Sequence, residues 1–147
     1  MIKSIKSFVI ALFLLLTVTQ TSCTSDDDTN TNVNSECEST ICTLVLMTIN
    51  VSIKDQDQNP VALDSFKVIN KDNGDDMTLT LSPTALAAAK ELGSYLLIQD
   101  GVLERNQKRN LQFKGYINNQ EVITSDYKVS TDCCHIGLDT GKLELTL

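Results

Sequence analysis

The chain is poor in the residues on which several large classes of function depend. It has no Trp, a single His, three Tyr and four Phe among its 147 residues. Sugar-binding surfaces on β-sheets rely on exposed aromatic rings, so this shortage argues against a stacking platform of several rings. The only His is His135, which leaves no second imidazole for a paired acid and base or for a histidine-rich metal site.

The motifs of common enzymes are also absent. Neither G-x-S-x-G nor H-E-x-x-H occurs, and there is no glycine-rich loop of the kind that holds phosphates. No nucleophile stands out as a partner for His135, which we expect to be a structural residue of a strand. Paired carboxylates leave a hydrolase as a distant third hypothesis. We therefore predict a protein that is not an enzyme and that uses no cofactor.

Positive charge is scarce. The chain has 12 Lys and Arg against 19 Asp and Glu, and its net charge is −7. Binding to nucleic acid requires Lys and Arg to neutralise phosphates, so we expect no nucleic-acid partner. The same acidic balance repels anionic lipid head groups, so we expect an attached lipid to be the contact with any membrane.

The start of the chain is basic and apolar. Lys3 and Lys6 precede an apolar run, Phe8 to Val18, that is too short to span a bilayer comfortably as a permanent helix. A basic start, a short apolar run and small residues before a cut site are typical of a secretory signal. Removal of this signal takes away the two positive charges of Lys3 and Lys6, so the net charge of −7 becomes −9.

The cut site has a cysteine. Thr21-Ser22-Cys23 resembles the lipobox of bacterial lipoprotein signals, although Gln20 stands where that family prefers an aliphatic residue. The resemblance implies that residues 1–22 are a signal peptide and that Cys23 becomes an acylated, palmitate-bearing terminus. The alternative is an ordinary signal peptide with an incidental cysteine.

Residues 23–36 combine this cysteine with a flexible acidic tether. The segment from Thr24 to Glu36 has one aliphatic residue, Val33, and so has little apolar surface to bury. The acidic run Asp26-Asp27-Asp28 resembles the surface-export tag of some Gram-negative lipoproteins. It implies a lipid anchor in the outer membrane and an outward-facing domain. A solvated spacer is the alternative for the same residues.

Four further cysteines belong to the domain, which we place at residues 37–147. An even number of cysteines in an exported domain favours disulfides. Neighbouring residues of a strand point to opposite faces, and residues an odd number of positions apart do so too. Cys37 and Cys42 can therefore each meet one of Cys133 and Cys134, in either pairing. Local bonds within each pair are an alternative.

A zinc site is a further alternative for the same cysteines. Cys133-Cys134-His135 with Cys37 and Cys42 supplies enough soft ligands. However, C-x₄-C and an adjacent pair lack the C-x₂-C spacing of zinc knuckles. An oxidising destination also disfavours free thiolates.

The pattern of the domain is that of short strands. Ile41 to Ile53 alternates with one apolar face broken only by Thr43, and its first half has apolar residues on both faces. One helix is indicated by Ser82 as N-cap, Pro83 at the first turn and Gly93 as the stop. Turns every 8–12 residues favour a mainly β fold, an antiparallel β-sandwich of seven to eight strands with one short helix.

One stretch resembles a known family. Residues Val51 to Leu63, with Asp55, Asn59 and Pro60 in the turn, are similar to the opening hairpin of carboxypeptidase-regulatory-like and transthyretin-like domains, although Asn59 stands where these usually have glycine. The resemblance implies a prealbumin-type sandwich with a non-catalytic role. Within it, Asp55, Asp57 and Asn59 are weak candidates for an oxygen metal site, but Pro60 and Phe66 stand where an EF-hand needs glycine and glutamate.

Together these patterns predict a lipid-anchored lipoprotein of the cell envelope. We expect it to attach to the outer membrane through its lipid and to act as a non-catalytic binding or accessory module. The alternative is a structural envelope protein that assembles with another surface component. The sequence does not identify an extracellular ligand or a partner protein.

Overall fold

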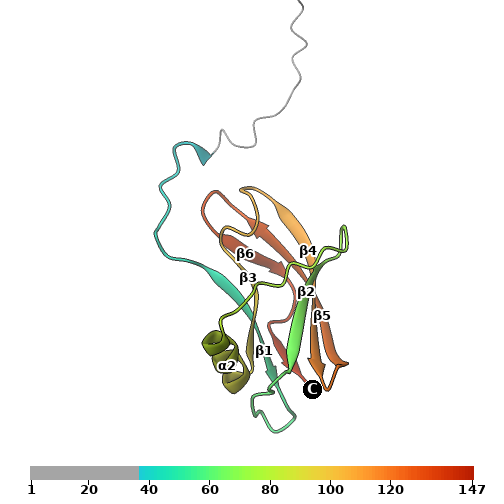
Figure 1. Cartoon of the computed structure of the whole chain (residues 1–147). Helices are drawn as coiled ribbons and strands as arrows, with labels where there is room; N and C mark the ends of the chain where they lie inside the picture. The colour runs from blue at the N-terminus through green and yellow to red at the C-terminus, as the bar shows by residue number, and fades with distance from the viewer. Residues whose placement is uncertain (1–36) are drawn as a thin grey trace, which may run out of the picture. The chain divides into compact units, whose positions relative to one another are not determined.

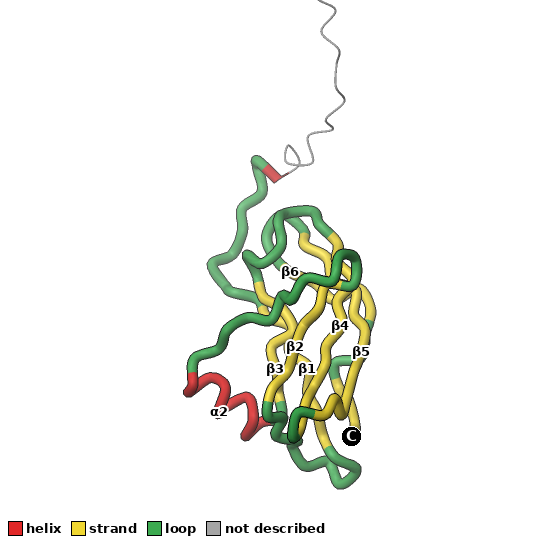
Figure 2. Tube along the Cα trace, turned by 45° about the vertical axis from the view of Figure 1, so that its right-hand side comes forward, coloured by secondary structure: helices red, strands yellow, loops and turns green. Residues whose placement is uncertain are grey.

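The computed structural model describes residues 37–147. The predicted signal peptide (1–22), the lipidated Cys23 and the acidic tether (23–36) lie outside the described residues. Seven strands form two sheets that face each other (Figures 1 and 2). A mainly β sandwich with one short helix is therefore confirmed for the described part of the chain.

The two sheets divide the strands unequally. The smaller sheet has the order β3-β1-β7, and the larger has the order β2-β4-β5-β6. The strands are β1 (Thr48–Lys54), β2 (Ser65–Asn70), β3 (Ser94–Gln99), β4 (Lys108–Ile117), β5 (Gln120–Thr131), β6 (Ile136–Thr140) and β7 (Glu144–Thr146). All neighbouring pairs are antiparallel except β1 and β7, which run parallel. The sandwich is thus antiparallel with one parallel pair.

The core lies between the sheets and follows the alternation of the sequence. Every second residue of β1 is buried, and these residues face the buried apolar residues of β2 and β4. The rings of Phe66, Tyr95 and Phe113 form its centre, with centroids 5.5 to 6.3 Å apart. Such ring clusters stabilise a core both by the area they bury and by edge and face contacts.

The hydroxyl of Tyr95 fixes the connection in which the chain passes from β1 in the smaller sheet to β2 in the larger sheet. It accepts a hydrogen bond from the backbone N–H of Leu63 at 2.6 Å and donates to the carbonyl of Val61 at 2.8 Å. Burial raises the pKa of this phenol, so the hydroxyl stays protonated and can donate. The segment between β1 and β2 is therefore held against β3.

The helix α2 (Pro83–Leu92) has both predicted ends. The Ser82 hydroxyl accepts from the Ala85 N–H at 3.2 Å, and Gly93 ends the helix in the left-handed region at φ 60°. A Cβ on Gly93 would lie 2.6 Å from the carbonyl oxygen of Ile53, so this close approach also requires glycine. The helix packs beside β3 (Figure 2).

The prediction of a strand from Ile41 to Ile53 is wrong in its first half. β1 begins at Thr48, where its pairing with β3 begins opposite Gln99. β3 ends there because the chain turns at Asp100-Gly101, with Gly101 at φ 83°. Without a partner strand, residues 41–47 have no regular secondary structure, bend at Leu44 and lie outside both sheets, and they are exposed instead of covered on both faces.

Polar residues also lie within strands. Val122 and Tyr127 belong to one continuous strand, β5, whose polar middle pairs with β4. The polar residues 108–110 begin β4, whereas the alternating stretch Met77 to Leu81 belongs to neither sheet. After the adjacent pair Cys133-Cys134, the next strand begins only at Ile136.

Candidate functional site

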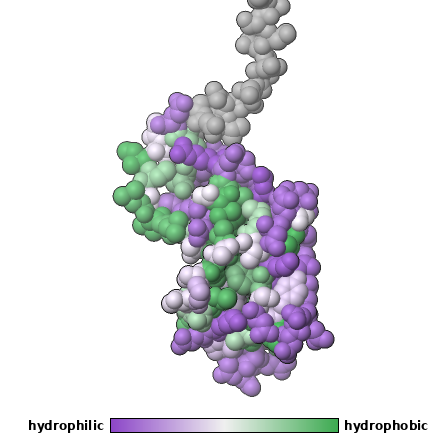
Figure 3. Space-filling view, viewed as in Figure 1, coloured by the Kyte–Doolittle hydropathy of each residue, from purple (hydrophilic) through white to green (hydrophobic). Residues whose placement is uncertain are grey.

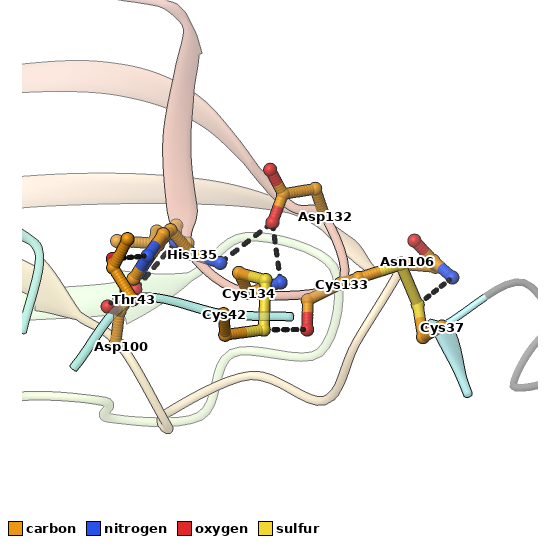
Figure 4. The surroundings of a disulfide bond; sticks show 10 residues. Cys37, Cys42, Thr43, Asp100, Asn106, Asp132, Cys133, Cys134 and His135 are labelled. Carbon is orange, nitrogen blue, oxygen red and sulfur yellow. Dashed lines mark hydrogen bonds and ion pairs between the residues drawn. A yellow bond between two sulfur atoms is a disulfide. The ribbon is translucent and has the colours of Figure 1, made fainter. Parts of the chain in front are cut away.

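Two disulfides fasten the start of the domain to the loop between β5 and β6. Cys37 is bonded to Cys133 and Cys42 to Cys134, with Cα atoms 5.2 and 5.3 Å apart (Figure 4). The predicted long-range pairing is confirmed, and the structure selects one of its two forms. Because all four sulfurs are in disulfides, they are not thiolates, and the alternative of a cysteine zinc site does not fit.

The Cys37 end of this junction is packed. Cys37 is only 4% exposed, and the side-chain amide of Asn106 donates to its sulfur at 3.4 Å. The Cys42 end is different because Cys42 itself is exposed. The first disulfide of the domain therefore involves a buried cysteine, and the residues that follow the second disulfide form an exposed segment without regular secondary structure.

A second set of contacts holds that segment. His135 Nε2 lies 2.9 Å from the Thr43 hydroxyl, and His135 Nδ1 lies 2.7 Å from Asp100 Oδ2 (Figure 4). The three side chains form a chain of hydrogen bonds from residue 43 to the end of β3. His135 lies just before β6 and is not in a strand, so the prediction that it is a strand residue is wrong. Its two ring nitrogens instead connect Thr43 to Asp100.

Asp100 is the centre of this arrangement. Its Oδ2 accepts from the backbone N–H of Met47 at 2.8 Å, and its Oδ1 accepts from that of Ile136 at 2.7 Å. Burial acts to raise the pKa of Asp100, but the hydrogen bonds from His135, Met47 and Ile136 outweigh it, so the pKa lies below its ordinary value. An ionised Asp100 thus joins β1, β3 and β6.

Residues 132–135 form the loop between β5 and β6, which we call the disulfide loop because it contains Cys133 and Cys134, and Asp132 caps it. Asp132 Oδ1 accepts from the backbone N–H groups of His135 at 2.7 Å and Cys134 at 2.6 Å, and these bonds hold the pKa of Asp132 below its usual range. This Asx turn fixes the direction in which Cys134 and His135 leave the loop. Beside it lies a depression of about 330 Å³ whose lining includes Cys42, Asp100 and Arg105.

The hydroxyl, imidazole and carboxylate of Thr43, His135 and Asp100 stand in the order used by hydrolytic triads. However, Asp100 also accepts two backbone N–H groups from different elements, and the disulfide at Cys42 fixes the residue next to Thr43. The contacts of His135 connect Thr43 to Asp100, which follows β3, so the three side chains position residue 43 against the sandwich.

What they position is an exposed apolar stretch, which we call the apolar segment, residues 41–47. Leu44 is fully exposed, Leu46 is 61% exposed and Met47 is 44% exposed; Ile41 and Val45 are exposed as well. Figure 3 shows hydrophobic side chains gathered on the side of the molecule where Figure 1 shows the chain entering β1. Large exposed apolar residues gathered in this way mark interaction sites.

The weak metal candidates lie at the other end of the sandwich. Asp55 Oδ1 accepts from the N–H groups of Asp57 at 2.9 Å and Asn59 at 2.8 Å, while the Asn59 amide donates to Asp55 Oδ2 at 3.0 Å. The bonds from Asn59 lower the pKa of Asp55. These contacts are those of a turn cap. Among residues 37–147, no group of three or more His, Cys, Asp or Glu is arranged to hold a metal ion.

The sequence contained one signal for the Thr43 contact. Thr43 is the polar exception in the apolar row from Ile41 to Ile53, and it is the residue whose hydroxyl meets His135. Nothing in the sequence indicated Asp100, because an Asp-Gly pair after a strand is typical of a turn. The cluster depends on three segments that the fold brings together.

Comparison with known proteins adds no relative. No protein-family model, no curated protein and no solved structure matches the chain. Within residues 37–147, none of the helical structure is both long and apolar enough to cross a membrane.

Proposed function

We propose that this protein is a lipid-anchored lipoprotein of the cell envelope whose sandwich is a non-catalytic binding or accessory module. The observation that carries the proposal is the apolar segment, which is exposed and yet held by a disulfide at Cys42 and by the contacts of Thr43 and Met47. Chains do not usually leave such apolar surface in water unless it has a partner.

The disulfides support the exported part of the proposal. Disulfides persist in oxidising compartments such as the periplasm and the cell surface, and the bonds at Cys37 and Cys42 link the first residues of the domain to its β5–β6 loop. The secretory signal and Ser22-Cys23 supply the means of export and of attachment. A fixed binding segment also loses less conformational entropy on binding than a free one.

The lipid anchor is tested by labelling cells with a fatty acid. Wild-type protein should incorporate the label and remain with the membrane, whereas Cys23→Ala should do neither. A Ser22→Ala variant keeps the cysteine and a small residue before it, so it is the matched control and should behave as wild type. Equal labelling of Cys23→Ala and wild type contradicts the anchor.

The orientation of the domain has a separate test. We propose that Asp26, Asp27 and Asp28 direct the lipoprotein to the outer face of the outer membrane. Added protease should then cleave the wild type on intact cells and should cleave a triple Asp→Ala variant much less, with equal lipid labelling. Protection of the wild type on intact cells, together with cleavage after lysis, contradicts surface exposure.

A structural envelope protein is the alternative. Chemical cross-linking in intact envelopes separates the two hypotheses, because an assembly protein should form one stoichiometric product with a second surface component. The same product should disappear when Leu44 and Leu46 are both replaced by Asn. A monomeric, uncross-linked protein favours the binding or accessory module.

A further inference from the structure

We propose that the apolar segment docks the sandwich directly on the lipid bilayer, so that the domain is held by two contacts, the acyl chain and this segment. The inference rests on the proposed lipid anchor, and it names the partner of the binding surface. It assigns residues 41–47 to the membrane interface and directs the opposite end of the domain away from it.

The first argument is chemical. The segment presents Ile41, Leu44, Val45, Leu46 and Met47 to solvent, as large aliphatic side chains without a polar end. No ionisable residue occurs between Glu38 and Lys54, although the chain as a whole has a net charge of −7. An acidic protein is repelled by anionic head groups, so an uncharged apolar surface is the face that can approach a bilayer.

The second argument is the place of the segment along the chain. The part of the chain before the described domain ends at residue 36, next to Cys37, and the apolar segment follows within a few residues. The tether from Cys23 to Cys37 spans at most about 50 Å when fully extended and about 20 Å as a coil. A bilayer that holds the lipid of Cys23 is therefore within reach of the segment.

This proximity changes the affinity that the segment needs. Once the acyl chain is inserted, docking becomes intramolecular, and a short linker corresponds to an effective concentration in the millimolar range. A weak interfacial contact by a few side chains then suffices to orient the domain.

The geometry limits how deep the segment can go. It has no regular secondary structure, and backbone N–H and C=O groups without partners are costly in hydrocarbon. The side chains therefore enter the boundary between head groups and acyl chains while the backbone stays at the level of the head groups. The disulfide at Cys42 and the bonds of Asp100 to Met47 and His135 hold the segment outside the sandwich in the position this requires.

Docking also fixes which parts of the domain face outward. The turn that Asp55 caps, between β1 and β2, lies at the end of the sandwich opposite the disulfide loop (Figure 1). With the apolar segment at the membrane, this turn points away from it.

Vesicle binding without the lipid tests the inference. The processed chain, residues 23–147, is prepared with Cys23→Ser so that it carries no acyl chain, and without residues 1–22, whose apolar run would bind lipid by itself. It should co-sediment with neutral phosphatidylcholine vesicles at millimolar lipid, which matches the effective concentration that the tether supplies. Leu44→Asn with Leu46→Asn should weaken partitioning by about tenfold or more, since several buried methylene groups are lost.

The matched control is Leu92→Asn. Leu92 is 67% exposed, close to the 61% of Leu46, but it lies on α2 and outside the segment. Its replacement should leave partitioning unchanged. Absence of vesicle binding by the parent protein, or an equal loss in the control, overturns the inference. A dimer in sedimentation equilibrium that the Leu44 and Leu46 substitutions dissociate also overturns it, because a second copy then covers the segment.

The absence of Trp allows a direct test of depth. Leu46→Trp introduces the only indole, whose emission should shift to the blue and be quenched by brominated lipids. Leu92→Trp should show neither change, and equal quenching of both contradicts the inference. Because these measurements use unacylated protein, their failure is separate from a failure of Cys23 labelling, which tests the lipid anchor alone.

Discussion

The carboxylate of Asp100 lies 2.7 Å from Nδ1 of His135, across 35 positions of sequence. Asp100 follows β3 of the smaller sheet, and His135 precedes β6 of the larger one. The pair therefore joins the two sheets at the end of the sandwich where the chain enters. Because Asp100 also accepts from the N–H of Met47, the same carboxylate fixes the start of β1 and the end of the apolar segment.

Removing this carboxylate should release the segment. Asp100→Ala leaves the N–H groups of Met47 and Ile136 without their acceptor and is expected to lower the free energy of unfolding by about 1–3 kcal/mol. Amide exchange of Met47 and Ile136, whose N–H groups donate to Asp100, should become faster, while exchange in β4 and β5 should change only with global stability. Hydrogen exchange followed by mass spectrometry measures both.

The control for this experiment is Asp57→Ala. Asp57 is exposed in the turn at the opposite end of the domain, where its backbone N–H and not its carboxylate makes the hydrogen bond to Asp55. The control should leave the exchange of Met47 and Ile136 unchanged. Equal protection of these two amides in wild type and Asp100→Ala contradicts the positioning role of the Asp100 carboxylate.

The disulfide loop should make stability depend on acid pH. The pKa of Asp132 is lowered by the N–H groups of His135 and Cys134, below the ordinary value of 3.8. A carboxylate with a lowered pKa stabilises the fold above its unfolded pKa, and this contribution is lost as the pH falls through the folded pKa. Chemical unfolding of the wild type should therefore show decreasing stability below about pH 4.

Asp132→Asn isolates that contribution from those of other carboxylates. It keeps a side-chain oxygen as acceptor but cannot titrate, so its stability should be lower than that of the wild type at pH 7, and the two should converge as the pH falls through the lowered pKa of Asp132 in the folded state. Unfolding curves at several pH values give the difference. A difference that stays constant with pH, or grows on acidification, contradicts the assignment.

The core hydroxyl has a prediction of its own. Tyr95→Phe keeps the ring between Phe66 and Phe113 but leaves the N–H of Leu63 and the carbonyl of Val61 without the hydroxyl. A buried N–H without an acceptor costs about 1–3 kcal/mol, so the variant should be less stable by that amount with an unchanged fold. Tyr116→Phe, at a partly exposed ring, is the control and should change stability much less. Equal effects contradict the role of the hydroxyl.

The elements that could be predicted from the sequence are those set by local pattern. Ser82, Pro83 and Gly93 fix α2 because each acts within one helical turn, and the alternation of apolar residues marks β1 from Ile49 onward because the core covers one face of it. The even number of cysteines and the exported context favoured long-range disulfides, but both pairings stayed open, and Cys133 and Cys134 lie in the loop before β6, outside the strand from which their opposite directions were inferred.

The parts that could not be predicted depend on where partner strands end. Ile41 to Met47 has the alternation and apolar residues of a strand, but a strand needs a neighbour, and β3 stops opposite Thr48. The hydrogen bonds that connect Thr43, His135 and Asp100 join three segments that are distant in sequence and meet only in the folded domain. In the candidate site, residues 41–47 have the sequence pattern of a strand but do not form one, because no neighbouring strand pairs with them.

The stabilities that the two disulfides contribute should be coupled. Whichever bond is removed first should cost less than the bond that is removed second. Each closes a long loop, with Cys37–Cys133 separated by 96 residues and Cys42–Cys134 by 92. In the chain-entropy model a loop of this length is worth about 4.7 kcal/mol. When one bond is present, however, the second closes only the small ring from Cys37 to Cys42 and back through Cys134 and Cys133, worth about 2.5 kcal/mol.

Removal of either bond by paired Cys→Ala substitutions should therefore cost about 2 to 3 kcal/mol, and removal of both about 7 kcal/mol. Losses that simply add, or a single removal that costs as much as the double, contradict this coupling. Denaturant unfolding of the three variants measures it, after non-reducing peptide mapping has verified the remaining bond. Loss of Cys42–Cys134 should also speed proteolysis within residues 41–47 more than loss of Cys37–Cys133, because only Cys42 lies within the apolar segment.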